Sequence, residues 1–374
     1  MKKAIYLLAA TALMASCNQD VLVDATNDQQ PEVSRRIGFD TFVDKATRAE
    51  GTNSTALNDF YPAFNVYGWK VVDGKAASVF NNVTVSYFNS EESTGVKPGD
   101  EWGSATTGWY YDNVRYWDKM ATSYQFSAYA PVAASDDVNC TAEGLIAIGT
   151  ETAPIKVEAT NLMKEPAEKL AYTGFKFDYM TAQSAENSLD KVTLNFKHLM
   201  AKLNIRIKLD DKITTASAVT VQEINVRGIN SLGYYTNETK VKGAVSGWSL
   251  PLFNEEAVIT AKMDKGYSLN AKENYNGYYV LEQLIIPQTI KKAANDDSQL
   301  NMYKEACVYV EYTIGDETFR SYSPLANIFS KDATYNFEGG KQYTINITVG
   351  PKPIVFDAEV TEWEKEVEGG LNMN

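Results

Sequence analysis

Histidine is nearly absent from this chain, whose 374 residues include a single one, His198. Zinc-protease motifs and metal sites built from several imidazoles are therefore excluded. A Ser-His-Asp triad would have to use His198, which lies in a strand-like run with no nucleophile turn beside it. There is no Gly-rich phosphate loop either. We interpret His198 as a strand histidine and expect no enzyme activity.

Cysteine is also scarce, because Cys17, Cys140 and Cys307 are the only three. Small disulfide-stapled domains carry a higher density. We expect Cys140 and Cys307 to be two separately buried thiols, with a bridge between them as the alternative. Basic residues are outnumbered, and the formal net charge of −13 disfavours nucleic acid and anionic lipid as partners.

Acidic residues are plentiful but unpatterned. The pairs Asp136-Asp137, Asp210-Asp211 and Asp296-Asp297 lack the alternating ligand spacing of a calcium loop. Each follows or precedes a strand-like run, so turn positions explain them. We therefore expect no metal and no cofactor.

Long hydrophobic runs are missing except at the N-terminus. Met1-Lys2-Lys3 precedes an apolar run from Ala4 to Ala15, which is a secretion signal pattern and too short to span a membrane. Small residues directly before Cys17 predict cleavage of a signal peptide of residues 1–16 and lipidation of Cys17, such as palmitate, although Met14 replaces the usual Leu. An ordinary signal peptide with an incidental cysteine is the alternative. Asn18, and not Asp, directly follows Cys17, which in a Gram-negative host favours passage of the lipoprotein to the outer membrane.

What the sequence does contain is strand-like alternation at short intervals. After a polar stretch, residues 17–36, that reads as a lipidated flexible tether, runs with period two recur. They are Ile37–Val43, Phe64–Val72, Asn82–Phe88, Tyr124–Ala130, Tyr278–Ile286, Ala306–Ile314 and Tyr343–Val349. The runs do not alternate with helices as in βαβ units, and only a few short helices are expected, such as Thr160–Leu170. This pattern of strands predicts an all-β chain of antiparallel β-sandwiches. The length fits two, at residues 37–185 and 186–374.

The stretch Val192–Leu209 changes phase in its middle. Val192, Leu194 and Phe196 share one parity, whereas the apolar residues from Leu199 to Leu209 share the other. Such a slip indicates either a bulge or two strands with a kink between them.

The two ends of the mature chain each carry a candidate strand. Ile37, Phe39, Thr41 and Val43 share one face of the first run, and a polar stretch that contains Arg48 follows it as an exposed loop. Near the C-terminus, residues 351–363 alternate through Ile354, Phe356, Ala358 and Val360. Pro351 and Pro353 confine that segment to a sheet edge or a free tail.

An aromatic cluster is the remaining feature that could bind a ligand. It consists of Trp102, Trp109, Tyr110, Tyr111, Tyr116 and Trp117. Exposed rings of this kind stack on sugar faces, but core packing in a sandwich is the favoured interpretation.

The order of several short motifs resembles the fimbrillin-like proteins, the lipoprotein pilins of type V. The motifs are Ile37-Gly38-Phe39, Ala46-Thr47-Arg48-Ala49, Val66-Tyr67-Gly68, Arg115-Tyr116-Trp117, Tyr124–Pro131, Leu194–Leu203, Ile285-Ile286-Pro287-Gln288, Gly340–Tyr343 and Glu362-Trp363. Each is weak alone, and the ordered set covers essentially the whole mature chain.

The resemblance implies two tandem transthyretin-like β-sandwiches and a role as an adhesive fimbrial subunit. It also implies a strand exchange. An Arg-specific surface protease would cut after Arg48, the first strand with Ile37, Phe39 and Val43 would leave, and a C-terminal donor strand (Ile354, Phe356, Ala358, Val360) from another subunit would fill the groove. Such a protein is delivered to the outer membrane by its lipid and ends in a fimbrium. Its partners would be other fimbrial subunits and a host or bacterial surface receptor or glycan.

Two features depart from that pattern. Arg35-Arg36 offers a second basic site before the first strand, where a cut would release the lipid without opening a groove. The segment after Trp363 is charged and Gly-rich, so the donor ends near Trp363 or the chain is not a stalk subunit. Stalk, tip and anchor roles stay open. The alternative function is a surface glycan-binding lipoprotein that uses the aromatic cluster.

Overall fold

Strands make up most of the chain in the computed structural model. It describes residues 36–43, 56–141, 143–156, 178–186, 191–210, 219–237, 244–251, 256–269, 281–291, 306–330, 334–350 and 354–362, all within one compact unit. Helix in these residues is limited to short turns, namely the 3₁₀ elements η2 (Leu57–Asp59), η3 (Asp100–Trp102) and η4 (Val132–Ala134) and the helix α1 (Leu325–Phe329). The all-β prediction is confirmed, whereas the transthyretin-like tandem stays a prediction.

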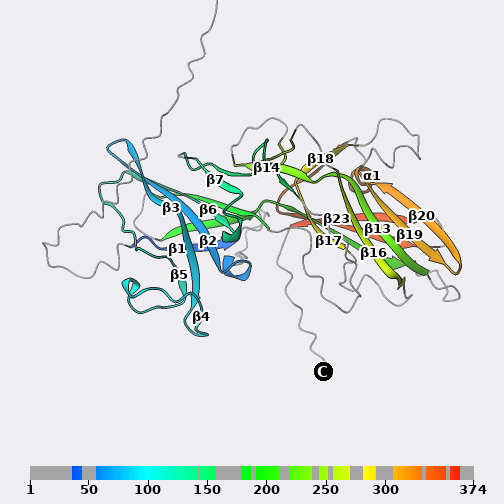
Figure 1. Ribbon diagram of the computed structural model, residues 1–374, viewed down its shortest axis with the longest axis horizontal. Coiled ribbons are helices and arrows are strands. Elements are labelled where there is room, and N and C mark those ends of the chain that lie inside the picture. Colours follow the sequence, from blue (N-terminus) through cyan, green and yellow to red (C-terminus); the bar gives the residue numbers. More distant parts are fainter. Residues whose placement is uncertain are drawn as a thin grey trace, which may run out of the picture. The chain divides into compact units, whose positions relative to one another are not determined.

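An eight-stranded sheet holds the N-terminal half (Figure 1). Its order is β1-β11-β10-β6-β2-β3-β4, with β5 paired to β3. The bounds are β1 Phe39–Val43, β2 Ala63–Val72, β3 Lys75–Asn89, β4 Thr94–Gly95, β5 Gly108–Tyr110, β6 Ser123–Ala130, β10 Met180–Glu186 and β11 Val192–His198. The β1–β11 pair is parallel and the other pairs are antiparallel.

The sequence explains this sheet locally. In β11 the buried positions alternate strictly with exposed ones, as period two requires of a strand with one face on a core. The hairpin between β2 and β3 turns at Asp73 and Gly74, whose φ angles are 49° and 71°. Two successive positive φ angles are what a tight hairpin turn needs, and Asp followed by Gly supplies them at little strain.

Two four-stranded sheets form most of the C-terminal half. One has the order β17-β12-β22-β23 and the other β16-β13-β19-β20. The bounds are β12 Ala201–Leu209, β13 Val219–Asn230, β16 Glu256–Leu269, β17 Leu281–Ile285, β19 Cys307–Ile314, β20 Glu317–Pro324, β22 Lys341–Val349 and β23 Val355–Glu362. Side chains from both sheets share one hydrophobic cluster, to which β22 contributes Tyr343, Ile345, Ile347 and Val349. These four face inward as the sequence predicts.

Shorter strands complete the fold. A five-stranded sheet joins β15 (Trp248–Ser249), β14 (Leu232–Thr236), β8 (Ile146–Ile148) and β7 (Val138–Cys140), with β9 (Ile155–Lys156) paired to β14. The last pair is β18 (Gln288–Lys291) with β21 (Thr334–Phe337).

The phase change in Val192–Leu209 marks a passage between sheets. The run is two strands, β11 and β12, which belong to different sheets, so the second of the two predicted alternatives is confirmed. The domain boundary at 185/186 stays a prediction; it falls within β10, which pairs with β11.

Several sequence-based predictions fall outside the described residues. These are the signal peptide, Cys17, most of the tether, Arg35, Arg48, the Thr160–Leu170 helix and Trp363. Within the part of the chain that is described, no helix is long and apolar enough to cross a membrane. Cys140 lies half-buried at the end of β7, whereas Cys307 is buried at the start of β19, in a different sheet.

Candidate functional site

The first strand lies at the edge of the eight-stranded sheet. Among the described strands β1 pairs only with β11, in a parallel register that runs from Phe39 opposite Val192 to Val43 opposite Phe196. An edge strand can be exchanged without breaking a second ladder, and its loss exposes a row of backbone donors and acceptors on its neighbour.

One face of this edge segment is fully covered. Ile37, Phe39, Thr41 and Val43 are 0%, 2%, 5% and 3% exposed. The Phe39 ring makes edge-on contacts with Phe64, Phe80, Tyr111 and Phe126, at centroid distances of 5.8, 5.5, 5.9 and 6.0 Å. Phe39 is therefore the central anchor of β1, and its removal would leave an apolar groove lined by rings.

Hydrogen bonds hold the start of this segment in place. The Ile37 N–H donates to the Arg115 carbonyl at 2.9 Å, and the Tyr111 hydroxyl donates to the Ile37 carbonyl at 2.7 Å. The same hydroxyl accepts the Arg115 N–H at 3.2 Å. Burial raises the pKa of Tyr111 well above its ordinary value, so this phenol stays protonated and can donate. Tyr111 thus ties Ile37, directly before β1, to the segment that contains Arg115.

Arg36 adds a clamp just before the strand. Its guanidinium donates to the Trp102 carbonyl at 2.9 Å and lies 5.7 Å from the centroid of the Trp102 ring. The indole N–H of Trp102 donates to the Tyr111 carbonyl at 2.9 Å. A backbone bridge pairs Arg36 with Tyr116. The Arg36 side chain is therefore held against the fold, which disfavours its use as a cleavage site.

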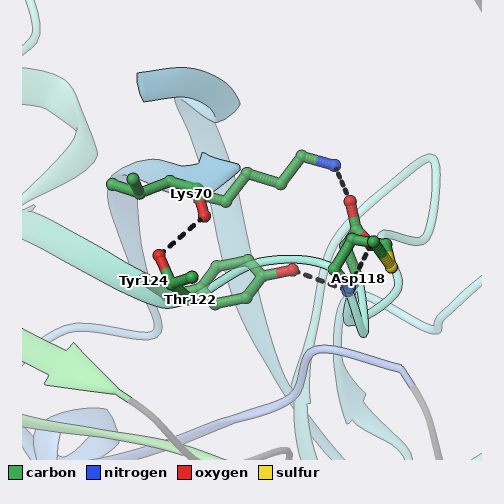
Figure 2. Close-up of polar contacts among 6 residues, drawn as sticks. Lys70, Asp118, Thr122 and Tyr124 are labelled. Atoms are coloured by element: carbon green, nitrogen blue, oxygen red, sulfur yellow. Dashed lines mark hydrogen bonds and ion pairs between the residues drawn. The ribbon is translucent and has the colours of Figure 1, made fainter. Parts of the chain in front are cut away.

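The segment that pairs with Arg36 continues into a turn, Asp118–Thr122, that several hydrogen bonds hold (Figure 2). One Asp118 carboxylate oxygen accepts from Lys70 Nζ at 2.7 Å and the other from the Met120 N–H at 2.9 Å. The Tyr124 hydroxyl accepts the Asp118 N–H at 2.6 Å, and the Thr122 hydroxyl donates to the Val71 carbonyl at 3.2 Å. The hydrogen bonds from Lys70 and Met120 lower the pKa of Asp118. This turn presents Met120, which is 71% exposed.

The C-terminal candidate strand also lies at a sheet edge. β23 pairs antiparallel with β22 from Val355–Thr348 to Glu362–Lys341, and no other described strand pairs with it. Ile354 is buried and Phe356 packs partly on the core, whereas Val355 and Val360 are 58% and 42% exposed. Within its own chain the segment therefore buries only part of its apolar surface.

The lone histidine has a packing role. His198 ends β11, buried, with Nδ1 2.8 Å from Asp178 Oδ2 and its ring 5.2 Å from that of Phe60. Its placement in a strand is as predicted. Among the described residues, no group of three or more potential ligands could hold a metal ion.

The aromatic cluster divides between core and surface. Trp109, Tyr111 and Trp117 are 8%, 4% and 2% exposed and belong to the N-terminal core, which confirms the core-packing interpretation for these three. Trp102 and Tyr110 are half-buried, and Tyr116 is 45% exposed. Sequence reasoning missed the ties from Tyr111 and Trp102 to β1, because nothing in an aromatic run signals which backbone atoms its polar groups reach.

Comparison with known proteins places the chain in a family. The profile of the fimbrillin-like family matches residues 47–363. Among solved structures, a fimbrial protein from Bacteroides vulgatus has a TM-score of 0.50 at 14% identity, over 88% of this chain and 100% of that one. The tip fimbrial protein Mfa3 from Porphyromonas gingivalis, with a C-terminal truncation, has a TM-score of 0.42 at 10% identity, over 88% and 100%. No curated protein matches. The chain belongs to the fimbrillin-like family.

Proposed function

We propose that this protein is a structural and adhesive fimbrial subunit, exported as a lipoprotein precursor and polymerised by protease-triggered strand exchange. The observation that carries this proposal is β1, an edge strand whose entire inner face is buried among aromatic rings. Family membership supports a fimbrial and non-enzymatic role.

The energetics of β1 suit a switch. Burial of Ile37, Phe39 and Val43 contributes about 1.5–3 kcal/mol for each side chain. While β1 is part of the chain, its high effective concentration keeps the groove filled. Once a cut separates β1 from the fold, the strand can diffuse away and a tethered or abundant competitor can replace it. The uncut precursor therefore does not polymerise, whereas the cut protein can bind a matching strand from another subunit.

We place the cut after Arg48, five residues beyond the end of β1. A cut there leaves the lipid on Cys17 joined to β1, so both would depart from the fold together. Cys17 would serve as a delivery tether at the outer membrane, and an uncut copy would stay anchored. Arg36 is the poorer site, because its guanidinium is bound to Trp102.

We assign the donor role to residues 351–363, with β23 at their centre. Strand addition at an exposed sheet edge is a general mode of recognition, in which backbone bonds give affinity and alternate side chains give specificity. The incomplete burial of Val360 in its own chain leaves apolar surface that a better-fitting groove would cover. The partners are other fimbrial subunits and an Arg-specific surface protease.

The proposal is tested by treating purified precursor with an Arg-specific protease and running it unheated on a denaturing gel. We expect one cut after Arg48, followed by a ladder of multimers that collapses on heating. Arg48→Ala should prevent both, whereas Arg36→Ala should prevent neither. A complete cut after Arg48 without any ladder would rule out the exchange.

A further inference from the structure

The two edge segments have matching sequences. Residues 37–43 read Ile-Gly-Phe-Asp-Thr-Phe-Val, and residues 354–360 read Ile-Val-Phe-Asp-Ala-Glu-Val. The isoleucine, phenylalanine, aspartate and second valine of the latter stand at the same positions in the former. The shared residues include the largest inward side chain, Phe39, which Phe356 matches.

The match holds only when the two strands run in the same direction. Ile37, Phe39, Thr41 and Val43 fill four successive sites of the groove. In the same direction Ile354, Phe356, Ala358 and Val360 fill these sites in order with side chains of similar size. In the opposite direction over the same seven positions, Ala358 would stand in the site of Phe39, where four rings converge. A cavity of that size is strongly unfavourable.

We propose that residues 354–360 of a second copy of this chain occupy the β1 groove parallel to β11, with Ile354 in the place of Ile37 and Phe356 in the place of Phe39. This inference rests on the proposed strand exchange and adds its direction and register. The donor side chains are then specificity-determining residues with named sites, and the strand is a copy of the one it replaces.

An ion pair supports the register. Lys191, directly before β11, lies with Nζ 3.1 Å from Asp40 Oδ1 of β1. In the proposed register Asp357 takes the place of Asp40 and meets the same lysine. In its own chain Asp357 Oδ1 accepts only from the adjacent Ala358 N–H, at 2.9 Å, among the described contacts. A shift of the donor by two residues would separate Asp357 from Lys191.

One mismatch favours the donor over the resident strand. Thr41 is 5% exposed, and its hydroxyl oxygen has no hydrogen-bond partner among the residues that the structure describes. A buried hydroxyl without a partner destabilises the state that buries it. Ala358 presents a methyl group at this site and no hydroxyl. The donor strand therefore leaves no unpaired hydroxyl in the groove. Once β1 has been cut free, binding of the donor is favoured over rebinding of β1.

The outward positions are compatible with this register as well. A Cβ at Gly38 would lie 3.3 Å from Cγ of Lys191, a flexible side chain that can shift by the little required. Val355 would add its apolar surface there against the lysine methylenes. Glu359 would take the place of Phe42, which is 36% exposed, so its charge would stay in water.

The direction of the donor strand also determines at which end of the groove the rest of its subunit lies. The chain that precedes Ile354 would reach the groove at the end where Arg36 lies, because Ile354 takes the place of Ile37. The body of the incoming copy would then meet the segment that pairs with Arg36, which exposes Tyr116 and continues to Met120.

The test uses the full chain cut by an Arg-specific protease in the presence of a labelled synthetic peptide of residues 351–363. Peptide retained on the protein is measured on an unheated gel and by fluorescence anisotropy. We expect the peptide to bind and to suppress the ladder. The same residues in reverse order should bind at least tenfold more weakly, and Phe356→Ala about 100-fold more weakly. Ala358→Thr should weaken binding about five- to tenfold, because it restores the unpaired hydroxyl.

Charge reversal tests the register. Asp357→Lys in the peptide should weaken binding several-fold, and Lys191→Glu in the protein should restore it, whereas Glu359→Lys should do neither. Equal binding of the reversed peptide would overturn the direction, and failure of the charge swap would overturn the register. If the cut protein multimerises but does not take up the peptide, this assignment of the donor falls while the exchange stands. If neither happens, the proposed function itself falls.

Discussion

At the scale of single residues, Phe39 has the largest share of the contacts that hold β1. Truncation to Ala would remove a ring that meets four others and leave a cavity in the N-terminal core. We expect Phe39→Ala to lower the free energy of unfolding by about 3–5 kcal/mol, as measured by denaturant titration.

The neighbouring Phe42 provides a matched control, because it belongs to the same strand and is 36% exposed. Phe42→Ala should change the free energy of unfolding by roughly 1 kcal/mol or less. Equal effects of the two substitutions would show that the inner face of β1 is not the stabilising one.

Tyr111 makes the stability of the fold sensitive to alkaline pH. Its pKa is raised by burial, so the folded state keeps the phenol proton at a pH where the unfolded chain has lost it. The contribution of this raised pKa is fully present below about pH 10, the unfolded value, and is lost as the pH rises through the folded value. In that window the free energy of unfolding should fall by about 1.4 kcal/mol per pH unit for this group.

Tyr111→Phe should remove that slope and also the hydrogen bond to the Ile37 carbonyl. Denaturant titrations at pH 9 to 11 would measure the change, with exposed Tyr116→Phe as the control. An unchanged alkaline slope in Tyr111→Phe would mean that this phenol is not the group that titrates.

At the scale of elements, alternation identified the strands whose two faces differ. The phase change around His198 predicted a break, and it separates β11 from β12. The inward set of β22 was also correct, because Tyr343, Ile345, Ile347 and Val349 face one core while the residues between them are polar.

Pairing partners could not be predicted in the same way. Nothing in the residues of β1 shows that it lies parallel to β11, more than 140 residues away, because side-chain alternation is the same in both directions. The clamp of Arg36 on Trp102 and the tie from Tyr111 to Ile37 were missed for a related reason. Each depends on a backbone carbonyl, whose position no side-chain pattern records.

Besides its proposed donor role, β23 covers the edge of β22. Its ladder runs along Lys341–Thr348, so its departure would uncover an edge of the C-terminal core. We expect truncation after Val349 to abolish multimers and also to raise amide hydrogen exchange in β22, measured by mass spectrometry. Truncation after Glu362, which keeps β23, should leave the exchange of β22 unchanged. Protection of β22 that survives loss of β23 would argue against this covering role.

At the scale of the whole molecule, exchange alters two sheet edges at once. In the proposed exchange, a subunit that gains a donor strand would refill the edge beside β11, whereas a subunit that gives one would uncover the edge of β22. The net gain must therefore come from a groove that β23 fits better than its own edge. Val360, which is exposed at the edge of β22, favours the exchange, and so does the buried Thr41 hydroxyl, which has no partner among the described residues.

The docking of subunit bodies, as distinct from their strands, is expected to involve Met120. Its turn is held by the Asp118, Thr122 and Tyr124 hydrogen bonds, so the backbone that presents this apolar side chain is already ordered before subunits meet. Burial of Met120 against an incoming body would contribute about 1.5–3 kcal/mol, so Met120→Asp should weaken association tenfold or more.

Val96 supplies the control, since it is 63% exposed and follows β4, which pairs with the end of β3 opposite to the one beside Met120. After protease treatment, Met120→Asp should shorten the ladder whereas Val96→Asp should not. Both variants should bind the peptide of residues 351–363 as the unaltered protein does, because neither residue lines the groove. A full-length ladder from Met120→Asp would place the contact between bodies elsewhere, and a loss of peptide binding would show that the turn shapes the groove.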